Sequence, residues 1–217
     1  MALAIFDLDE TLIGGDCASL WAREMVKLGW ADGDSFIARE QELMRQYSAG
    51  ELAMEDYMAF TLSPLVGRTA EEVAHVVEPF VEEVIEPIFY SDATRCLATH
   101  RVAGDRILLI SASAHFLVSA IAARLGIQEV LAINLEQQHG GYSGNTRGVL
   151  TYREGKVTRL KAWLEEQGES LDGAYFYSDS RNDLPLLQLV SKPLVVNPDP
   201  VLQQHAEQAG WPILSWR

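Results

Sequence analysis

The chain has 217 residues, an apolar fraction of 48% and a charged fraction of 22%, which suits a globular protein built as one domain or as one domain with an insert. Its net charge is −14 and it has no basic run, so neither nucleic acid nor an anionic membrane is expected as a partner. No apolar stretch approaches a membrane span, and the first residues do not resemble a signal peptide, which predicts a cytoplasmic protein. Cys17 and Cys96 could pair, but a reduced protein is the simpler interpretation.

The first segment is an apolar run over residues 2–6 that leads directly into Asp7 and Asp9. A run that is apolar on both faces predicts a buried parallel strand, and open α/β sheets bind ligands beyond the carboxyl ends of such strands. Two neighbouring carboxylates repel each other, which favours a cation beside them, and Mg²⁺ is the natural candidate. For this stretch alone, an ordinary turn that uses aspartate is an equally good explanation.

A helical segment follows the first strand. The predicted helices occupy residues 17–28, 35–48, 54–62 and 69–83. Asp16 is the predicted N-cap of the first helix, and Gly50 is predicted to end the second. A capping box at Thr69 starts the last helix, which Pro79 should kink. We therefore expect a helical domain over residues 16–88 that covers the carboxyl end of the first strand like a lid.

From residue 89 onward, predicted strands and helices alternate. The predicted strands are residues 106–110, 129–134, 173–177 and 193–196, with a β-hairpin within 133–151. The predicted helices are residues 92–102, which Asp92 should cap, 116–125, 157–167, 184–190 and 200–209. This alternation predicts right-handed crossovers and a parallel sheet covered by helices on both faces. The fold class is therefore α/β, with a Rossmann-like core formed by residues 1–15 and 89–217.

Three later points bring polar groups to the carboxyl ends of strands. Ser111 and the main-chain N–H of Ala112 could hold an anion, although alone a serine N-cap is the simpler explanation. Lys156 lies at the start of a predicted helix, where a positive charge is unfavourable, so it could be there to neutralise nearby carboxylates or a phosphate. Without the other motifs, an ordinary surface lysine is the simpler explanation. Asp179 could complete the metal site of the first acid pair, and Asp183 could hold a metal-bound water or the lysine. An aspartate-rich turn is the alternative for this last pair.

The order of these points resembles the motif set of the haloacid dehalogenase (HAD) superfamily of phosphohydrolases, in the branch that contains phosphoserine phosphatase. Residues 7–11 match that family's DxDxT motif, and Ser111 matches its second motif. Lys156 matches the third motif and residues 179–183 match the fourth. The resemblance spans nearly the whole chain. It implies the HAD fold with an inserted α-helical cap, and a phosphatase that acts on a small phosphorylated metabolite with Mg²⁺ as cofactor.

The resemblance also implies roles in catalysis. Asp7 would attack phosphorus and form an aspartyl-phosphate. Asp9 would protonate the leaving alcohol and then take a proton from the attacking water. Asp7, Asp179 and the backbone carbonyl of Asp9 would ligate Mg²⁺. Two alternatives are a phosphotransferase that moves the phosphoryl group to another alcohol, which the motifs do not exclude, and a non-catalytic binding protein on a HAD scaffold, against which the intact motifs argue.

The remaining motif residues would bind the phosphate and support the metal, again by resemblance. Ser111 and the Ala112 N–H would hold phosphate oxygens together with Lys156. Asn182 and Asp183 would order the metal-bound waters and the lysine. The resemblance thus assigns these residues to the same edge of the predicted sheet as the first acid pair.

Substrate recognition is expected in the cap. Phosphoserine phosphatases of this family use a cap glutamate for the substrate amine and a cap arginine for its carboxylate. Asp16 occupies the place of the glutamate, but residues 57–62 contain no basic residue, which makes phosphoserine doubtful. The aromatic and sulfur side chains expected near Asp16 are Trp21, Tyr57, Met58 and Phe60. They suit an ester with an amine and an aromatic group, such as histidinol phosphate, although core packing is the commoner role for such residues.

Overall fold

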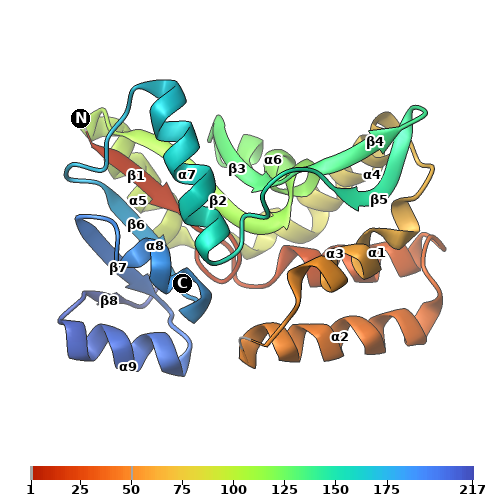
Figure 1. Cartoon of the computed structure of the whole chain (residues 1–217), viewed down its shortest axis with the longest axis horizontal. Coiled ribbons are helices and arrows are strands. Elements are labelled where there is room, and N and C mark those ends of the chain that lie inside the picture. Colours follow the sequence, from red (N-terminus) through yellow and green to blue (C-terminus); the bar gives the residue numbers. More distant parts are fainter. Residues whose placement is uncertain (1, 50) are drawn as a thin grey trace.

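A computed structural model, which describes residues 2–49 and 51–217, contains a six-stranded sheet flanked by helices and a second group of helices beside it (Figure 1). The strand order is β3-β2-β1-β6-β7-β8, and each pairing in this sheet is parallel. The strands are β1 (Leu3–Phe6), β2 (Arg106–Ala114), β3 (Glu129–Ile133), β6 (Tyr175–Ser178), β7 (Lys192–Val196) and β8 (Ile213–Leu214). The predicted α/β fold with a parallel sheet is confirmed.

Strand β1 lies inside the sheet, between β2 and β6, and all of its residues are buried. Because side chains alternate along a strand, Ile5 joins the hydrophobic cluster on one face and Phe6 the cluster on the other. The helices that cover the two faces are α5 (Ser91–Ala103), α6 (His115–Arg124), α7 (Glu154–Gln167), α8 (Leu184–Leu187) and α9 (Pro200–Ala209). Burial on both faces fixes the position of the acids that follow β1.

The second group of helices follows β1 in the chain and lies beyond the carboxyl edge of the sheet (Figure 1). Its helices are α1 (Cys17–Lys27), α2 (Gly33–Ala49), α3 (Met54–Leu62) and α4 (Ala70–Phe80). As predicted, Asp16 caps α1 through its side chain, and Thr69 forms a complete capping box at α4. Gly50, the predicted end of α2, lies outside the described residues. Within the part of the chain that is described, no helix has the length and apolarity to cross a membrane.

The two connections between the helical group and the sheet run side by side. Ile13 forms an antiparallel bridge with Phe89, and the Gly14 N–H donates to the Ile88 carbonyl at 2.8 Å. Paired entry and exit strands are what an inserted domain requires. On this basis we propose that residues 16–88 form a cap domain and that the rest of the chain forms the core.

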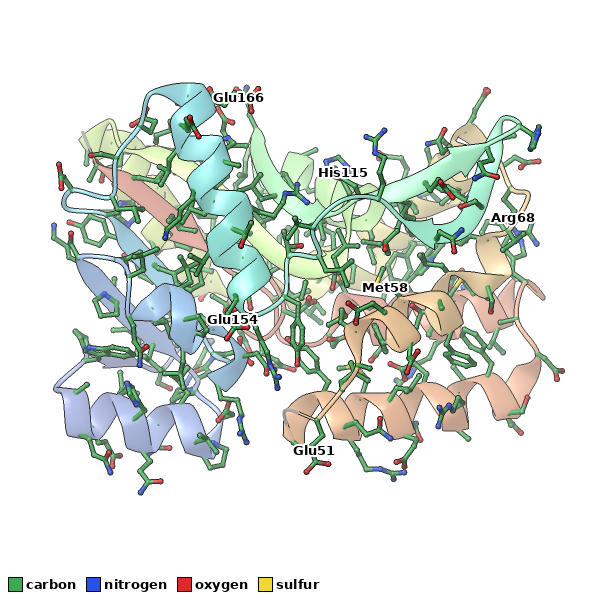
Figure 2. The ribbon with its side chains drawn as sticks, viewed as in Figure 1. Glu51, Met58, Arg68, His115, Glu154 and Glu166 are labelled. Atoms are coloured by element: carbon green, nitrogen blue, oxygen red, sulfur yellow. The ribbon has the colours of Figure 1, made fainter. Side chains whose placement is uncertain are left out.

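A β-hairpin of the core forms a further contact with the cap, separate from the two chain connections. It consists of β4 (Leu135–Gln138) and β5 (Gly141–Thr146), inside the range predicted for a hairpin. Arg68 lies beside this hairpin (Figure 2). The Gly67 N–H donates to the Tyr142 carbonyl, and the Tyr142 N–H donates to the Arg68 carbonyl, both at 2.9 Å. A methyl group on Gly141 would lie 2.8 Å from the Gly67 backbone, so only glycine allows this approach. The hairpin therefore fastens the cap to the core.

Three local predictions were wrong. Asp92 lies inside α5 rather than at its N-cap, because its carboxylate binds the main-chain N–H of Arg217 instead. The helix predicted to end at residue 83 runs through Pro79 as α4 and then continues as a π-helical turn over Val81–Ile85, where the Glu86 N–H donates to the Val81 carbonyl. The strand predicted to end at Ser111 continues to Ala114, because its small residues remain extended and pair again with β3.

Candidate active site

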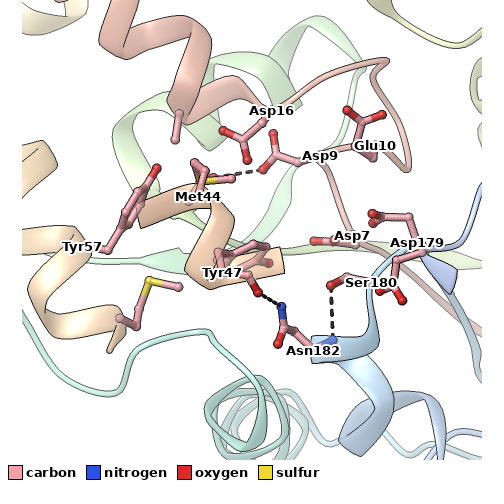
Figure 3. A pocket seen from close by; sticks show the side chains of 15 residues that line it. Asp7, Asp9, Glu10, Asp16, Met44, Tyr47, Tyr57, Asp179, Ser180 and Asn182 are labelled. Carbon is pink, nitrogen blue, oxygen red and sulfur yellow. Dashed lines mark hydrogen bonds between the residues drawn. The ribbon is translucent and has the colours of Figure 1, made fainter. Parts of the chain in front are cut away.

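A pocket of about 230 Å³ lies between the carboxyl edge of the sheet and helices α1 to α3. The core contributes Asp7, Asp9, Ala112, Ser113, Asp179 and Asn182 to its walls, and the cap helices contribute Ala18, Met44, Tyr47, Met54 and Tyr57. Figure 3 shows Asp7 and Asp179 on one side and Tyr57 on the opposite side, with Asp9 and Asp16 between them. The acids that the sequence separates by more than a hundred residues thus face one cavity.

Lys156 lies behind this wall, buried to 2% exposure, and connects two acids. Its Nζ donates to Asp7 Oδ1 at 2.9 Å and to a carboxylate oxygen of Asp183 at 2.8 Å. Burial alone would lower the pKa of Lys156, but the charges of Asp183 and Asp7 outweigh it and raise that pKa above its ordinary value. Burial raises the pKa of Asp7 to about 6 even though the ammonium opposes it. The Ser178 hydroxyl also donates to Asp183, at 2.7 Å, which fixes the lysine's second partner.

The backbone around Lys156 is tightly constrained. Lys156 lies in the first turn of α7, which begins at Glu154, earlier than predicted. A methyl group on Gly155 would lie 1.9 Å from the Leu150 carbonyl oxygen, so this position requires glycine. The preceding Arg153 has a φ of 50°, a conformation that is uncommon outside glycine. The turn therefore directs the lysine inward, although a cation in this turn is unfavourable for the helix itself.

The Asp9 carboxylate is held by the chain on both oxygens. The Cys17 N–H, at the start of α1, donates to Oδ1 at 2.6 Å, and the Ser113 hydroxyl donates to Oδ2 at 3.0 Å. Burial and the nearby charge of Asp16 raise the pKa of Asp9 to about 8. Asp9 is therefore connected to the cap through α1 and to the core through β2, and it faces the pocket between them.

Asp179 lies beside Asp7 and brings a second carboxylate to the pocket wall (Figure 3). The Thr11 hydroxyl donates to Asp179 Oδ1 at 3.1 Å. Burial, and then the charges of Asp7 and Asp183, raise the pKa of Asp179 well above its ordinary value, so a cation at this place would relieve the repulsion.

Among the described residues, no group of three or more Asp, Glu, His or Cys side chains is arranged to hold a metal ion. The carboxylates of Asp7 and Asp179, which lie side by side at the pocket wall, are available as donors. Mg²⁺ is usually held in this way, by one or two carboxylates together with waters and phosphate oxygens. The residues present therefore fit Mg²⁺ better than a metal that needs a full set of protein ligands.

The residues expected to bind phosphate lie on the last part of β2. Ser111 is fully buried, its Oγ accepts the Ser113 N–H at 3.1 Å, and its carbonyl accepts the Thr151 hydroxyl at 2.6 Å. Ala112 and Ser113, but not Ser111, line the pocket. Because α6 begins only at His115, the N–H groups at this position belong to an extended strand and not to a helix N-terminus.

Asn182 and Asp183 have different partners. Asp183 binds Lys156, as the sequence suggested, whereas Asn182 joins the core to the cap. Its Nδ2 donates to the main-chain carbonyl of Tyr47 at 3.4 Å (Figure 3). Its Oδ1 accepts the Tyr152 hydroxyl at 3.3 Å. Asn182 therefore contacts the cap helix α2 directly.

The cap residues selected from the sequence are only partly in the pocket. Asp16 and Tyr57 line it, although Asp16 also caps α1. Phe60 stacks on Phe36 with ring centroids 4.6 Å apart and is not a lining residue, so its placement supports packing and not recognition. Trp21 packs edge-on against aromatic rings of the cap. Trp21 and Met58 both line a smaller pocket that adjoins the first.

Several residues of the site were not identified from the sequence. Thr11 could have been, since it belongs to the DxDxT motif and contacts Asp179. The hydroxyls of Ser113 and Ser178, which bind Asp9 and Asp183, carry no signal beyond their closeness to motifs. Tyr47 lies in the helix predicted over residues 35–48, but a helical pattern does not reveal which turn faces a ligand.

Comparisons with known proteins agree with this arrangement. A histidinol-phosphatase of Neisseria meningitidis serogroup C (strain 8013) is 39% identical over 219 residues, which cover 99% of each chain. A protein of unknown function from Bordetella pertussis Tohama I is 36% identical, with a TM-score of 0.90 over 98% of this chain and 97% of the other. A phosphoserine phosphatase solved as an analogue of its phospho-aspartyl intermediate shares the fold, with a TM-score of 0.73 at 18% identity over 98% and 92%.

The relative from Neisseria meningitidis is named a phosphatase, which does not favour the phosphotransferase or non-catalytic alternatives. The family whose pattern matches the chain is described as haloacid dehalogenase-like hydrolase, and the match extends over residues 4–188, which includes the first and fourth motifs. The resemblance inferred from the motifs is therefore confirmed. The chain belongs to the haloacid dehalogenase-like hydrolase family and is one of its phosphatases.

Proposed function

We propose that this phosphatase hydrolyses the phosphate monoester of a small metabolite in two steps, with an aspartyl-phosphate on Asp7 between them. The observation that carries the proposal is the buried contact of 2.9 Å between the Lys156 ammonium and Asp7 Oδ1 at the pocket wall. In the first step an oxygen of Asp7 attacks phosphorus, and the bond from phosphorus to the leaving oxygen breaks. In the second step water attacks phosphorus, and inorganic phosphate leaves the regenerated carboxylate.

Charge neutralisation is the main requirement, because a phosphate dianion repels the attacking carboxylate. Lys156 provides a fixed positive charge, which Asp183 keeps in place. Asp7, Asp179 and the main-chain carbonyl of Asp9 would hold Mg²⁺, which would supply further positive charge to neutralise the phosphate. The hydrogen bonds to Asp7 and Asp183 fix the Lys156 ammonium at the pocket wall, and the Ser178 hydroxyl fixes Asp183 in turn.

Asp9 handles the protons in both steps. A proton on its carboxyl group passes to the leaving oxygen in the first step, and the resulting carboxylate takes a proton from water in the second. The Cys17 N–H and the Ser113 hydroxyl orient the group throughout. The Ala112 N–H at the pocket wall holds a phosphate oxygen, and the Ser111 hydroxyl, buried behind that wall, supports it by a second hydrogen bond once the phosphate is bound.

The pocket supports a substrate whose alcohol part is positively charged. Among the described residues that line it, no lysine, arginine or histidine occurs, whereas carboxylates are abundant. A substrate carboxylate would be buried there without a cation, while an amine would lie near Asp16. The relative from Neisseria meningitidis is named a histidinol-phosphatase. Histidinol phosphate has an amine and no carboxylate, and we propose it as the substrate in preference to phosphoserine.

A comparison of three esters tests this proposal. We expect kcat/KM for histidinol phosphate to exceed that for phosphoserine by at least about 100-fold, because an unpaired buried carboxylate costs more than a few kcal/mol. p-Nitrophenyl phosphate serves as the control for chemistry without amine recognition. Initial rates in the same Mg²⁺ buffer give the comparison. Equal rates on the first two esters would show that the cap does not select for charge.

Metal removal tests the cofactor. EDTA is expected to abolish turnover, and added Mg²⁺ to restore it. The Asp179→Asn variant should need at least about 10-fold more Mg²⁺ for half-maximal rate, because it loses one of two carboxylate ligands. Glu10→Gln, which changes another carboxylate of the pocket wall, is the matched control and should keep the wild-type requirement. Full activity in EDTA after dialysis would contradict the cofactor assignment.

A further inference from the structure

A second, smaller pocket adjoins the first. It has a volume of about 30 Å³, and the two pockets share Ala18, Tyr57 and Ser113 as lining residues. Its other walls come mainly from apolar side chains of the cap and of α6, among them Trp21, Met25, Met58, Leu62 and Phe116. We call it the side pocket. Tyr57, which lines both pockets, lies on the side of the first pocket opposite Asp179 (Figure 3). The side pocket therefore lies on the side toward which the far end of a bound leaving group would extend.

Two hydrogen-bond donors border the side pocket without partners. Trp21 and Tyr57 are only 4% and 5% exposed, and within the described residues neither the Trp21 Nε1 nor the Tyr57 hydroxyl has a hydrogen-bond partner. Buried polar groups in native proteins are nearly always paired, so two unpaired donors at one small cavity need an explanation. Burial, together with the charges of Asp16 and Glu40, raises the pKa of Tyr57 well above its ordinary value, so this hydroxyl keeps its proton.

We propose that the side pocket is a subsite for the far end of the leaving alcohol, where Trp21 Nε1 donates a hydrogen bond to an acceptor atom of the substrate and the Tyr57 hydroxyl bonds a second polar atom of it. The inference rests on the proposed hydrolysis of a phosphate monoester. An indole N–H can only donate, so the substrate atom that it meets must carry a lone pair. The nearby carboxylate of Asp16 disfavours an anionic acceptor, which leaves a neutral one.

The size of the side pocket narrows the substrate class further. A volume of about 30 Å³ admits one or two water-sized groups, which is the edge of a flat ring and not a whole chain. The apolar walls suit the rest of such a ring. The substrate class is therefore a phosphate monoester of a short amino alcohol that ends in a neutral nitrogen heterocycle. Its phosphate would lie at Asp7, its amine near Asp16, the ring nitrogen that carries the lone pair at Trp21 Nε1, and the ring N–H at the Tyr57 hydroxyl.

The Tyr57→Phe variant tests the subsite, because it removes the hydroxyl and leaves the ring. With histidinol phosphate, kcat/KM should fall at least about 10-fold. With O-phosphoethanolamine, which has the amine but no ring, it should stay within about twofold of wild type. The melting temperature should not decrease, since the lost hydroxyl has no partner in the protein. Tyr175→Phe, which removes a hydroxyl bound to Lys192 outside both pockets, is the matched control.

Binding of histidinol itself separates this inference from the proposed function. Calorimetry should show at least about 10-fold weaker binding to Tyr57→Phe, and also to Trp21→Phe, than to the wild type, whether or not the phosphate ester is turned over. Failure of the wild type to hydrolyse histidinol phosphate, together with this loss of binding, would reject the proposed substrate but keep the subsite. An equal loss of kcat/KM on both esters would overturn the subsite. The absence of a loss on either ester would also overturn it, because the side pocket would then hold only water.

Discussion

The Asp7→Asn variant is expected to lose at least about 10⁴-fold in kcat, because an amide oxygen does not form the phosphoryl intermediate. Since the catalytic residues act together, the loss of the nucleophile alone should remove most of the rate enhancement. The change keeps the size of the side chain. Lys156 retains its second partner, Asp183, so no buried charge is left alone. We therefore expect the variant to fold, with a loss of unfolding free energy of at most about 3 kcal/mol. Initial rates and thermal unfolding of the same preparation provide both measurements.

The matched control is Asp172→Asn, since Asp172 is exposed and lies between α7 and β6, before the strand whose carboxyl end carries Asp179. Its kcat should equal that of the wild type. If Asp7→Asn kept even a tenth of wild-type turnover after deamidation to aspartate had been excluded by mass, Asp7 would not be the nucleophile.

The Asp9→Asn variant is expected to lose about 10²- to 10⁴-fold in kcat, the usual contribution of a positioned general acid and base. Asparagine can still accept the Cys17 N–H at this position, so the side chain should keep its orientation. The two steps should respond differently to the leaving group. p-Nitrophenol leaves without a proton, so the first step should stay fast with its phosphate ester while the second becomes slow.

This difference predicts a burst of p-nitrophenol, equal to about one equivalent of enzyme and followed by a slow steady state. The wild type, with Asp9 available for the second step, should show a much smaller burst. Stopped-flow absorbance measures both phases. A variant that loses turnover without a burst would indicate that Asp9 acts before the intermediate only, or that it supports the fold of the α1 N-terminus.

The sequence allowed the core and its motifs to be predicted because their signals are local. Strand β1 is apolar throughout, and a buried parallel strand needs that pattern. Asp7 and Asp9 follow it directly, so their place at the edge of the sheet could be predicted with it. Lys156 and Asp183 also follow from motif order, although their contact with each other depends on the packing of α7 beside α8.

Long-range contacts explain most of what could not be predicted. Asp16 and Asp92 both precede helical patterns, yet only Asp16 is an N-cap, because Asp92 binds the chain end at Arg217. The close approach of Gly155 to Leu150 leaves no trace in composition or periodicity. The side of the pocket formed by the cap helices was the part that could least be predicted. A helical pattern shows which face of a helix is apolar, but not which turn of that face lies at the pocket.

The most direct test of the account is to locate the phosphoryl group. The Asp9→Asn enzyme is mixed with p-nitrophenyl phosphate and Mg²⁺, quenched in acid, and analysed by intact mass and peptide mapping. The account predicts one added phosphoryl group per chain, on the peptide that contains Asp7, and its absence from the same variant that also carries Asp7→Asn. A phosphoryl group on Ser111, or steady turnover with no labelled residue under conditions where the burst is observed, would contradict it.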